Sequence, residues 1–120
     1  MIKKLEADFL QNDERGLICQ IFSKPINQVN YLFTKKGSKR GRHYNKENRE
    51  IFYVISGSVK LNSFAVGMQN KPESHSFKTG CLFAVEPYTM HSFTFLEDTQ
   101  MIVMYDKGVE NSDGKDIYVE

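Results

Sequence analysis

The sequence predicts an all-β protein, either a sandwich or a barrel, and three observations support this prediction. Short runs of β-branched and aromatic residues recur along the chain, Gly, Asn, Asp and Pro separate them, and helical periodicity is weak throughout. With 120 residues, the chain has the length of one domain that buries one hydrophobic core. We therefore expect a single β domain over residues 1–120.

The predicted strands are short and follow one another closely. The most regular one covers residues 58–64, where Val59 and Leu61 alternate with Lys60 and Asn62, as in a strand with one buried face. Eight or more such strands without a long helix are typical of a sandwich or barrel. The other predicted ranges are 16–23, 28–34, 50–55, 75–77, 81–85, 91–95 and 100–105.

The connections between strands also have signals. Ser56-Gly57 predicts a hairpin between residues 50–55 and 58–64, because glycine accepts the positive φ of a tight turn. The polar stretch 66–74, which contains Gly67 and Pro72, is expected to be the loop that separates the two halves of the barrel. Residues 3–11 are the one segment that could form a short helical turn.

Composition and charge exclude several classes of function. A net charge of +1 gives no overall field for nucleic acid or membrane binding, so neither partner is expected. No stretch approaches the roughly 18 apolar residues of a membrane span, and residues 1–11 lack the apolar run of a signal peptide. The cytoplasm is therefore the expected compartment, with Cys19 and Cys81 as buried free thiols.

The basic residues cluster in one segment of the chain. This segment is either a solvated loop or a local site for a phosphate or carboxylate group, and the sequence leaves both interpretations open. The five residues are Lys35, Lys36, Lys39, Arg40 and Arg42.

The segment from Gly37 to Gly57 resembles the first cupin motif. It reads Gly37, five residues, His43-x-Asn45, four residues, Glu50, six residues and Gly57, so that Asn45 replaces the second histidine of the motif. From Gly80 the chain reaches His91 with the spacing of the second motif, although Glu86 and Tyr88 replace its proline and glycine. The resemblance implies a cupin double-stranded β-helix, or jelly-roll barrel. His75, which is flanked by serines beside a polar loop, is expected to be structural.

The same residues can form a site on physical grounds. Residues two apart in a strand share a face, so His43 and Asn45 are expected to point into the barrel together. Glu50 begins the next strand and His91 a later one, so that the four side chains can converge at the barrel mouth. If a divalent metal binds, these four are its ligands, but the carboxamide weakens the set and we expect no cofactor.

A second resemblance narrows the family. Asp13-x-Arg15-Gly16, Val29-x-Tyr31 and Arg40-Gly41-x-His43 are similar to motifs of the cupins that act on nucleotide-linked deoxysugars. These cupins are the dTDP-4-keto-6-deoxyhexose 3,4-ketoisomerases and, more distantly, the 3,5-epimerases. Tyr105-Asp106 and the segment 116–118 are also similar to their closing segment.

The resemblance implies an isomerase or epimerase of a 4-keto-6-deoxy sugar in polysaccharide biosynthesis, with a sugar or nucleotide-sugar ligand. His43 is the expected base, because imidazole titrates near neutral pH, and Tyr31 or His91 is the expected proton donor. A nucleotide diphosphate would suit guanidinium groups. The expected substrate-binding residues are Arg40, Arg42, Asn45, Glu50 and Tyr53.

Asn45 keeps alternatives open, because a carboxamide carries no proton near neutral pH. One is a noncatalytic carbohydrate-binding or sensory cupin, and another is a metal-dependent cupin enzyme. A homodimer is expected from the resemblance and from the need of a short barrel to cover its edge strands.

Overall fold

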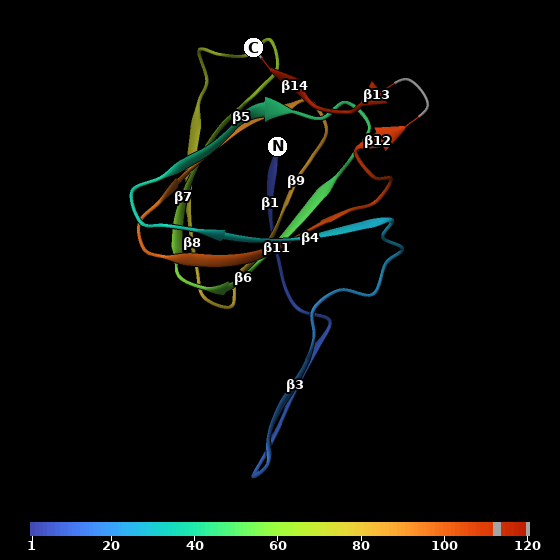
Figure 1. The fold of residues 1–120 in the computed structure, drawn as a ribbon, viewed down its shortest axis with the longest axis vertical. Coiled ribbons are helices and arrows are strands. Elements are labelled where there is room, and N and C mark those ends of the chain that lie inside the picture. Colours follow the sequence, from blue (N-terminus) through green and yellow to red (C-terminus); the bar gives the residue numbers. More distant parts are fainter. Residues whose placement is uncertain (112–113, 120) are drawn as a thin grey trace.

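The structure, a computed structural model, describes residues 1–111 and 114–119 (Figure 1). Within these residues all helix and strand structure is β, which confirms the predicted class, and no helix is long and apolar enough to cross a membrane. The strands are β1 (Ile2–Leu5), β2 (Phe9–Asp13), β3 (Gly16–Gln20), β4 (Gln28–Thr34), β5 (Lys39–Tyr44), β6 (Glu50–Ser56), β7 (Ser58–Ala65), β8 (Glu73–Lys78), β9 (Leu82–Val85), β10 (Thr89–Phe95), β11 (Thr99–Tyr105), β12 (Glu110–Asn111), β13 (Gly114–Lys115) and β14 (Tyr118–Val119).

Two five-stranded antiparallel sheets form the barrel. The first has the order β1-β9-β6-β11-β4 and the second the order β14-β5-β10-β7-β8. From β4 to β11 the chain changes sheet at every step except from β7 to β8, which gives the predicted jelly roll. The inner faces share one apolar core, built around Phe52, Phe83 and Met101 of the first sheet and Leu61 and Phe93 of the second.

The chain changes sheet at Ser56-Gly57, so the predicted hairpin is wrong. β6 pairs with β9 and β11, whereas β7 pairs with β10 and β8. Gly57 has a φ of 114°, and a Cβ on it would lie 2.4 Å from Thr99 Oγ1. The glycine therefore serves a close crossing against the start of β11, which the local sequence does not reveal.

The polar segment 66–74 lies within one sheet. It connects β7 with β8, which pair from Ser58↔Lys78 to Ser63↔Glu73. The expectation that this segment separates the two halves of the barrel is therefore wrong, because the halves are joined at other crossings.

The N-terminal residues form strands instead of the helical turn expected at residues 3–11. β1 adds to the edge of the first sheet beside β9, and β2 pairs with β3 in a hairpin that projects from the barrel (Figure 1). Leu10, Leu17 and Ile18 of this hairpin are 59%, 63% and 61% exposed. Cys19 in the hairpin and Cys81 beside the core are free thiols as predicted, although both are only half-buried.

Asp116, which is 1% exposed, fixes the loop between β5 and β6. Its carboxylate accepts hydrogen bonds from the backbone N–H groups of Lys46, Glu47 and Asn48, and from the Asn48 side chain at 2.9 Å. Burial alone would raise the pKa of Asp116, but the hydrogen bonds from Asn48 and from the three backbone groups lower it overall. Because β6 starts directly after this loop, Asp116 helps to fix the position of Glu50.

Candidate functional site

A cavity of about 220 Å³ lies between the two sheets, and residues of β4 and β5 form part of its wall. Its polar residues come from both sheets, and apolar side chains of the barrel core form the rest of the wall. Among the described residues, one group of His, Cys, Asp or Glu side chains has metal-binding geometry, and it lies in this cavity. The polar lining residues are Arg40, His43, Glu50, His91 and Tyr105.

His43 on β5 lies directly opposite His91 on β10. Their rings meet edge to face, with centroids 4.7 Å apart and an interplanar angle of 67°. A shift of register follows at His91/Ser92, and Gly41 lies against it with a φ of 101°. A Cβ on Gly41 would lie 2.8 Å from the His91 carbonyl oxygen, so only glycine lets β5 approach β10 in this way.

The His91 ring is held by its backbone neighbour. Its Nδ1 lies 3.0 Å from the Thr89 carbonyl oxygen, which only accepts hydrogen bonds, so Nδ1 carries the proton of the neutral ring. Its Nε2 lies 3.3 Å from Glu50 Oε1. Burial lowers the pKa of His91 to about 4, so the ring is neutral at pH 7 and Nε2 is free to accept a proton.

Glu50 supplies the acid of the cavity. It is 2% exposed, and burial raises its pKa to about 8. A hydrogen bond from Tyr105 acts in the opposite direction and lowers the pKa. At neutral pH the carboxyl group is therefore largely protonated and can donate a proton. Glu50 Oε1 and His91 Nε2 are both buried without a well-aligned hydrogen bond, so each is available to a ligand.

Tyr105 is the site residue to which sequence analysis assigned no role. It lies opposite Glu50 in the β11–β6 ladder, and burial beside the Glu50 carboxyl raises the pKa of its hydroxyl. The alternation of Met101, Val103 and Tyr105 along one face of β11 was the available signal, because it places Tyr105 on the core side of the strand.

His43 has the properties of a base in this cavity. It is partly buried, and burial lowers its pKa from 6.5, while a hydrogen bond to the Gly41 backbone opposes the shift. The ring is therefore mainly neutral at pH 7, and the nitrogen that does not bond to Gly41 can accept a proton.

A family model described as the polysaccharide biosynthesis C-terminal domain matches residues 11–118. The chain belongs to this family. No curated protein sequence gave a match.

Solved structures show the fold of this polysaccharide biosynthesis domain in other proteins. A 3,4-ketoisomerase from Helicobacter canadensis has a TM-score of 0.80 and 17% identity over 99% of this chain and 90% of its own. The WlaRB TDP-quinovose 3,4-ketoisomerase from Campylobacter jejuni has a TM-score of 0.78 and 17% identity over 96% and 92%. A dTDP-4-dehydrorhamnose 3,5-epimerase from Sulfolobus tokodaii has a TM-score of 0.69 and 23% identity. The match covers 80% of this chain but only 65% of the epimerase. These likenesses confirm the cupin jelly roll for this chain.

Two of the predicted tyrosines do not reach the cavity of this domain. Tyr31 is 60% exposed on the outer face of β4, where its hydroxyl donates a hydrogen bond to Gln100 Oε1 at 2.7 Å. Tyr53 packs with Ile51 and Leu82 on the outer face of the first sheet. Side chains alternate along a strand, so Leu32 and Phe52 occupy the inward positions beside them.

Asn45 also lies apart from the group formed by His43, Glu50 and His91. It follows the end of β5, and its side-chain N–H donates to the backbone oxygen of Asp116. The prediction that Asn45 shares a face with His43 inside the barrel is wrong, because Asn45 belongs to the loop that Asp116 fixes. The residue at the second histidine position of the motif is therefore structural here.

The two predicted arginines separate at β5. Arg40 lines the cavity, and its Nε donates to Thr34 Oγ1 at 2.8 Å, which joins β5 to β4. Arg42 has a φ of 64° and lines a hollow on the outer face of the second sheet. Left-handed backbone is uncommon outside glycine, so the conformation of Arg42 is energetically unfavourable. It accompanies the pairing of His43 with His91.

The departures from the second motif have structural explanations. Glu86, at the proline position, forms an ion pair with Arg49, the residue before Glu50. Its Oε1 lies 2.5 Å from Arg49 Nε. Tyr88, at the glycine position, has a φ of 59°, the left-handed conformation that glycine adopts freely. His75 lies outside the cavity, 3.8 Å from Glu73 and stacked on Phe77, in agreement with its expected structural role.

The cavity can perform proton transfer or bind a metal. The ligand atoms of His43, Glu50 and His91 lie within 4.8 Å of one another. Two histidines and one carboxylate fit the donor set of a divalent transition metal, with Asn45 absent from it. Without a metal, the same groups are a neutral imidazole that accepts a proton and a carboxylic acid that donates one.

Proposed function

We propose that this protein isomerises or epimerises a nucleotide-linked 4-keto-6-deoxy sugar by acid–base catalysis. The observation that carries the proposal is that a neutral, partly buried imidazole, His43, and a buried protonated carboxyl, Glu50, lie within 4.8 Å of each other in one small cavity. Such a pair suits a ketone with acidic protons beside its carbonyl, because one group removes a proton while the other donates to the oxygen.

The proposed reaction moves two protons. His43 removes the proton from the carbon beside the ketone, and Glu50 donates its proton to the ketone oxygen, which gives a neutral enediol. In the isomerase direction, the Glu50 carboxylate then takes the proton of the neighbouring hydroxyl, and the His43 imidazolium protonates the former carbonyl carbon. Both residues return to their starting states, and the ketone has moved by one carbon.

The other residues have supporting roles in this proposal. His91, a proton donor in the sequence prediction, has its Nδ1 proton directed at Thr89 and is neutral, so we assign it an orienting role toward Glu50. Arg40 lies at the cavity wall, where its guanidinium can attract the anionic part of a sugar nucleotide. The missing second histidine leaves the reaction possible, because His43 can both remove and return the proton.

Similar proteins bind such ligands. Structures of the QdtA 3,4-ketoisomerase from Thermoanaerobacterium thermosaccharolyticum contain TDP, and a histidine-to-asparagine mutant of that enzyme is in complex with TDP-4-keto-6-deoxyglucose. A 3′-monoepimerase from Streptomyces bikiniensis is in complex with dTDP-quinovose. These ligands support a sugar nucleotide as the substrate class for this chain.

The test is incubation with dTDP-4-keto-6-deoxyglucose in deuterated water, with NMR detection of deuterium at the carbons beside the ketone. We expect exchange with the native protein, loss of at least 100-fold in rate in His43→Gln, and little change in the matched variant His75→Gln. Binding of the sugar nucleotide without exchange would overturn the proposal and favour a noncatalytic carbohydrate-binding protein.

A metal-dependent enzyme is the second candidate, and the unpaired Glu50 Oε1 and His91 Nε2 favour it. A divalent metal held by His43, Glu50 and His91 would polarise the ketone oxygen. We propose that the enzyme works without a cofactor, because Glu50 can supply the proton instead. Elemental analysis of protein purified without chelator tests this proposal. One transition-metal ion per chain, with activity lost when the metal is removed, would support the metal-dependent enzyme and contradict the cofactor-free one.

We also propose a cytoplasmic homodimer in which the β2–β3 hairpin of one copy packs against β4 of the other. The hairpin exposes Leu17 and Ile18, and β4, an edge strand, exposes Val29 at 62% and Phe33 at 48%. Neither surface is covered by the described part of the chain, and each offers free strand edges for pairing. The free thiols of Cys19 and Cys81 suit a reducing compartment.

A further inference from the structure

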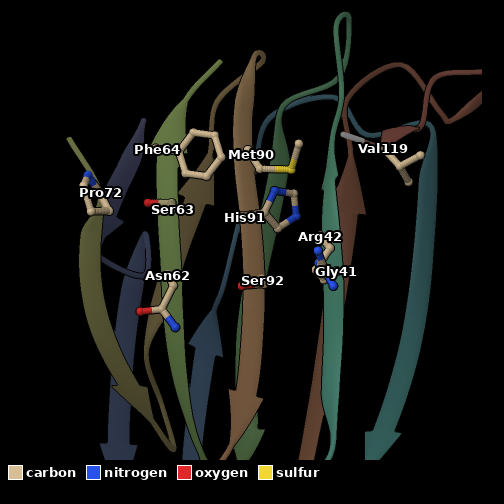
Figure 2. A pocket seen from close by; sticks show the side chains of 10 residues that line it. All are labelled: Gly41, Arg42, Asn62, Ser63, Phe64, Pro72, Met90, His91, Ser92 and Val119. Carbon is tan, nitrogen blue, oxygen red and sulfur yellow. The ribbon is translucent and has the colours of Figure 1, made fainter. Parts of the chain in front are cut away.

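The two members of the proposed acid–base pair belong to different sheets and are held in different ways. His43 lies opposite His91 in the second sheet, where β10 lies between β5 and β7 (Figure 2). β10 pairs with β7 over its whole length, from Thr89 to Phe95, so ladder contacts continue on both sides of His91. Glu50, in contrast, is the first residue of β6, and the ladders of this strand end at it. The position of Glu50 therefore depends on contacts beyond the ladders.

Three strands of the first sheet end together at Glu50. Its partners in the two ladders are Val85, the last residue of β9, and Tyr105, the last residue of β11. The end of a strand opens locally more readily than its centre, because fewer ladder contacts hold it. Glu50 is nevertheless buried, and its carboxyl group lines the cavity. Contacts next to this row of residues are therefore needed to keep the three strand ends closed.

The residues that adjoin these strand ends form a second row. We call Arg49, Glu86 and Asp106 the end row. The Arg49 backbone N–H donates to Asp106 Oδ1 at 3.0 Å, and the Asp106 backbone N–H donates to the Arg49 carbonyl oxygen at 3.4 Å. On the other side, Arg49 Nε donates to Glu86 Oε1 at 2.5 Å. Arg49 therefore joins the ends of β9 and β11, and it directly precedes Glu50.

The ion pair of the end row has the properties of a structural contact. The side chains of Arg49 and Glu86 are 29% and 24% exposed, so water screens their charges less than those of a fully exposed pair. The Glu86 backbone N–H also donates to the Met1 carbonyl oxygen at 2.9 Å, which extends the pairing of β9 with β1. The proline of the second cupin motif could make neither contact, because it has no carboxylate and no N–H. The substitution at position 86 therefore adds two contacts at this end of the sheet.

We propose that Arg49 and Glu86 are positioning residues, which hold the carboxyl group of Glu50 in the cavity by closing the end of the first sheet. This rests on the proposed function, in which Glu50 is the acid. Neither positioning residue lines the cavity, so both act through the backbone that carries Glu50. A displacement of about 1 Å at a catalytic group is enough to slow a reaction about 100-fold. An ion pair outside the cavity thus determines how well the acid inside it reaches the ketone oxygen.

The test is the rate of deuterium incorporation into dTDP-4-keto-6-deoxyglucose by Arg49→Gln, Glu86→Gln and the double variant. We expect each single variant to lower the maximal rate about tenfold or more and to change KM less than about twofold, because neither residue lines the cavity. The double variant should be within about twofold of the slower single variant, since both changes remove the same contact. Arg49→Lys, which keeps the charge, should stay within about threefold of the native rate. Glu110→Gln, at an exposed ion pair with Lys115, is the matched control and should be unchanged.

Backbone amide hydrogen exchange of the protein without substrate tests the same contact. We expect the amides of residues 50–53 to exchange about tenfold faster in Arg49→Gln and Glu86→Gln, and those of β10 to be unchanged. A native maximal rate of deuterium incorporation in both variants would overturn the proposal, whatever their unfolding free energy, because the pair would then only stabilise the fold. If the native protein itself incorporates no deuterium, the proposed function fails, and amide exchange alone decides whether the pair holds the strand end.

Discussion

The imidazole of His43 lies across the β5–β10 ladder from that of His91, with ring centroids 4.7 Å apart, and Gly41 makes this pairing possible. The glycine brings the two backbones so close that a single added methyl group would meet the His91 carbonyl oxygen. The geometry of the proposed base thus depends on a residue without a side chain.

Gly41→Ala is expected to disrupt both the fold and the site. The new Cβ would lie 2.8 Å from the His91 oxygen and 3.0 Å from Ser92 Cα, at a φ of 101°. We expect a loss of about 2–4 kcal/mol in the free energy of unfolding, measured by urea denaturation, and loss of deuterium exchange. Gly67→Ala is the control, since Gly67 has a φ of 88° and no atom within 4 Å of the added Cβ. Equal losses in the two variants would mean that backbone strain, and not the close approach, determines the effect.

Glu50 should make the protein less stable as pH rises. Its pKa is raised from 4.5 in the unfolded chain to about 8 in the folded protein, so folding favours the protonated form. The stabilisation is complete below pH 4.5 and is lost as pH rises through about 8. Glu50→Gln, which stays neutral, is therefore expected to be more stable than the native protein at pH 9 by a few kcal/mol, at about 1.4 kcal/mol per pKa unit.

Chemical denaturation at pH 5 and pH 9 measures this difference. Glu73→Gln, a change at an exposed carboxylate, controls for the general effect of alkaline pH. If the difference in unfolding free energy between the native protein and Glu50→Gln were the same at pH 5 and pH 9, Glu50 would be ionised in the folded state.

The sequence was sufficient to predict the barrel and the three side chains that meet in the cavity. Strand 28–34 was predicted with its observed limits, and the motif spacing identified His43, Glu50 and His91, because these features are local. Tyr31 was expected in the site on the basis of motif similarity but lies outside the cavity, whereas Tyr105 of the neighbouring strand lines it. Which face of a strand points inward depends on pairing between distant segments, and motif spacing alone does not report it.

Asn45 and Gly57 show the same limit. A His-x-Asn pair implies one shared face only if the strand continues, but β5 ends at Tyr44 and Asn45 turns to a C-terminal segment more than 70 positions away. Ser56-Gly57 has the composition of a hairpin, and only the packing of Thr99 against Gly57 shows that the chain crosses to the other sheet.

Asp116→Ala is expected to loosen the loop before Glu50. Three backbone N–H groups and the Asn48 amide would lose their acceptor, with a cost of about 1–3 kcal/mol in unfolding free energy. The pKa of Asp116 is lowered from 3.8, so its contribution is present above that pH and is lost as pH falls through the folded value. Glu110→Ala, at an exposed ion pair, should change stability by less than about 0.5 kcal/mol. A similar small change in Asp116→Ala would contradict the anchoring role.

Ile18→Lys and Val29→Lys are each expected to dissociate the proposed dimer. Ile18 is 61% exposed on the hairpin and Val29 is 62% exposed on β4, so a lysine at either position would place a charge in the apolar contact. Light scattering with size-exclusion chromatography measures the mass. Leu96→Lys, at an exposed apolar residue elsewhere, should remain dimeric. Dimers that persist in both hairpin and β4 variants would place the interface on another surface.

The contacts of Asp116 have a consequence for the order of folding. The loop that precedes Glu50 is anchored by a residue 68 positions later in the chain than Asn48, so this contact can close only after residue 116 has been synthesised. Contacts between such distant segments are slow to form because of their loop-closure entropy. During translation, the β strands around the core can begin to pair while the loop before Glu50 is still unanchored. Emergence of Asp116 from the ribosome is therefore the step that allows the loop before Glu50 to be anchored.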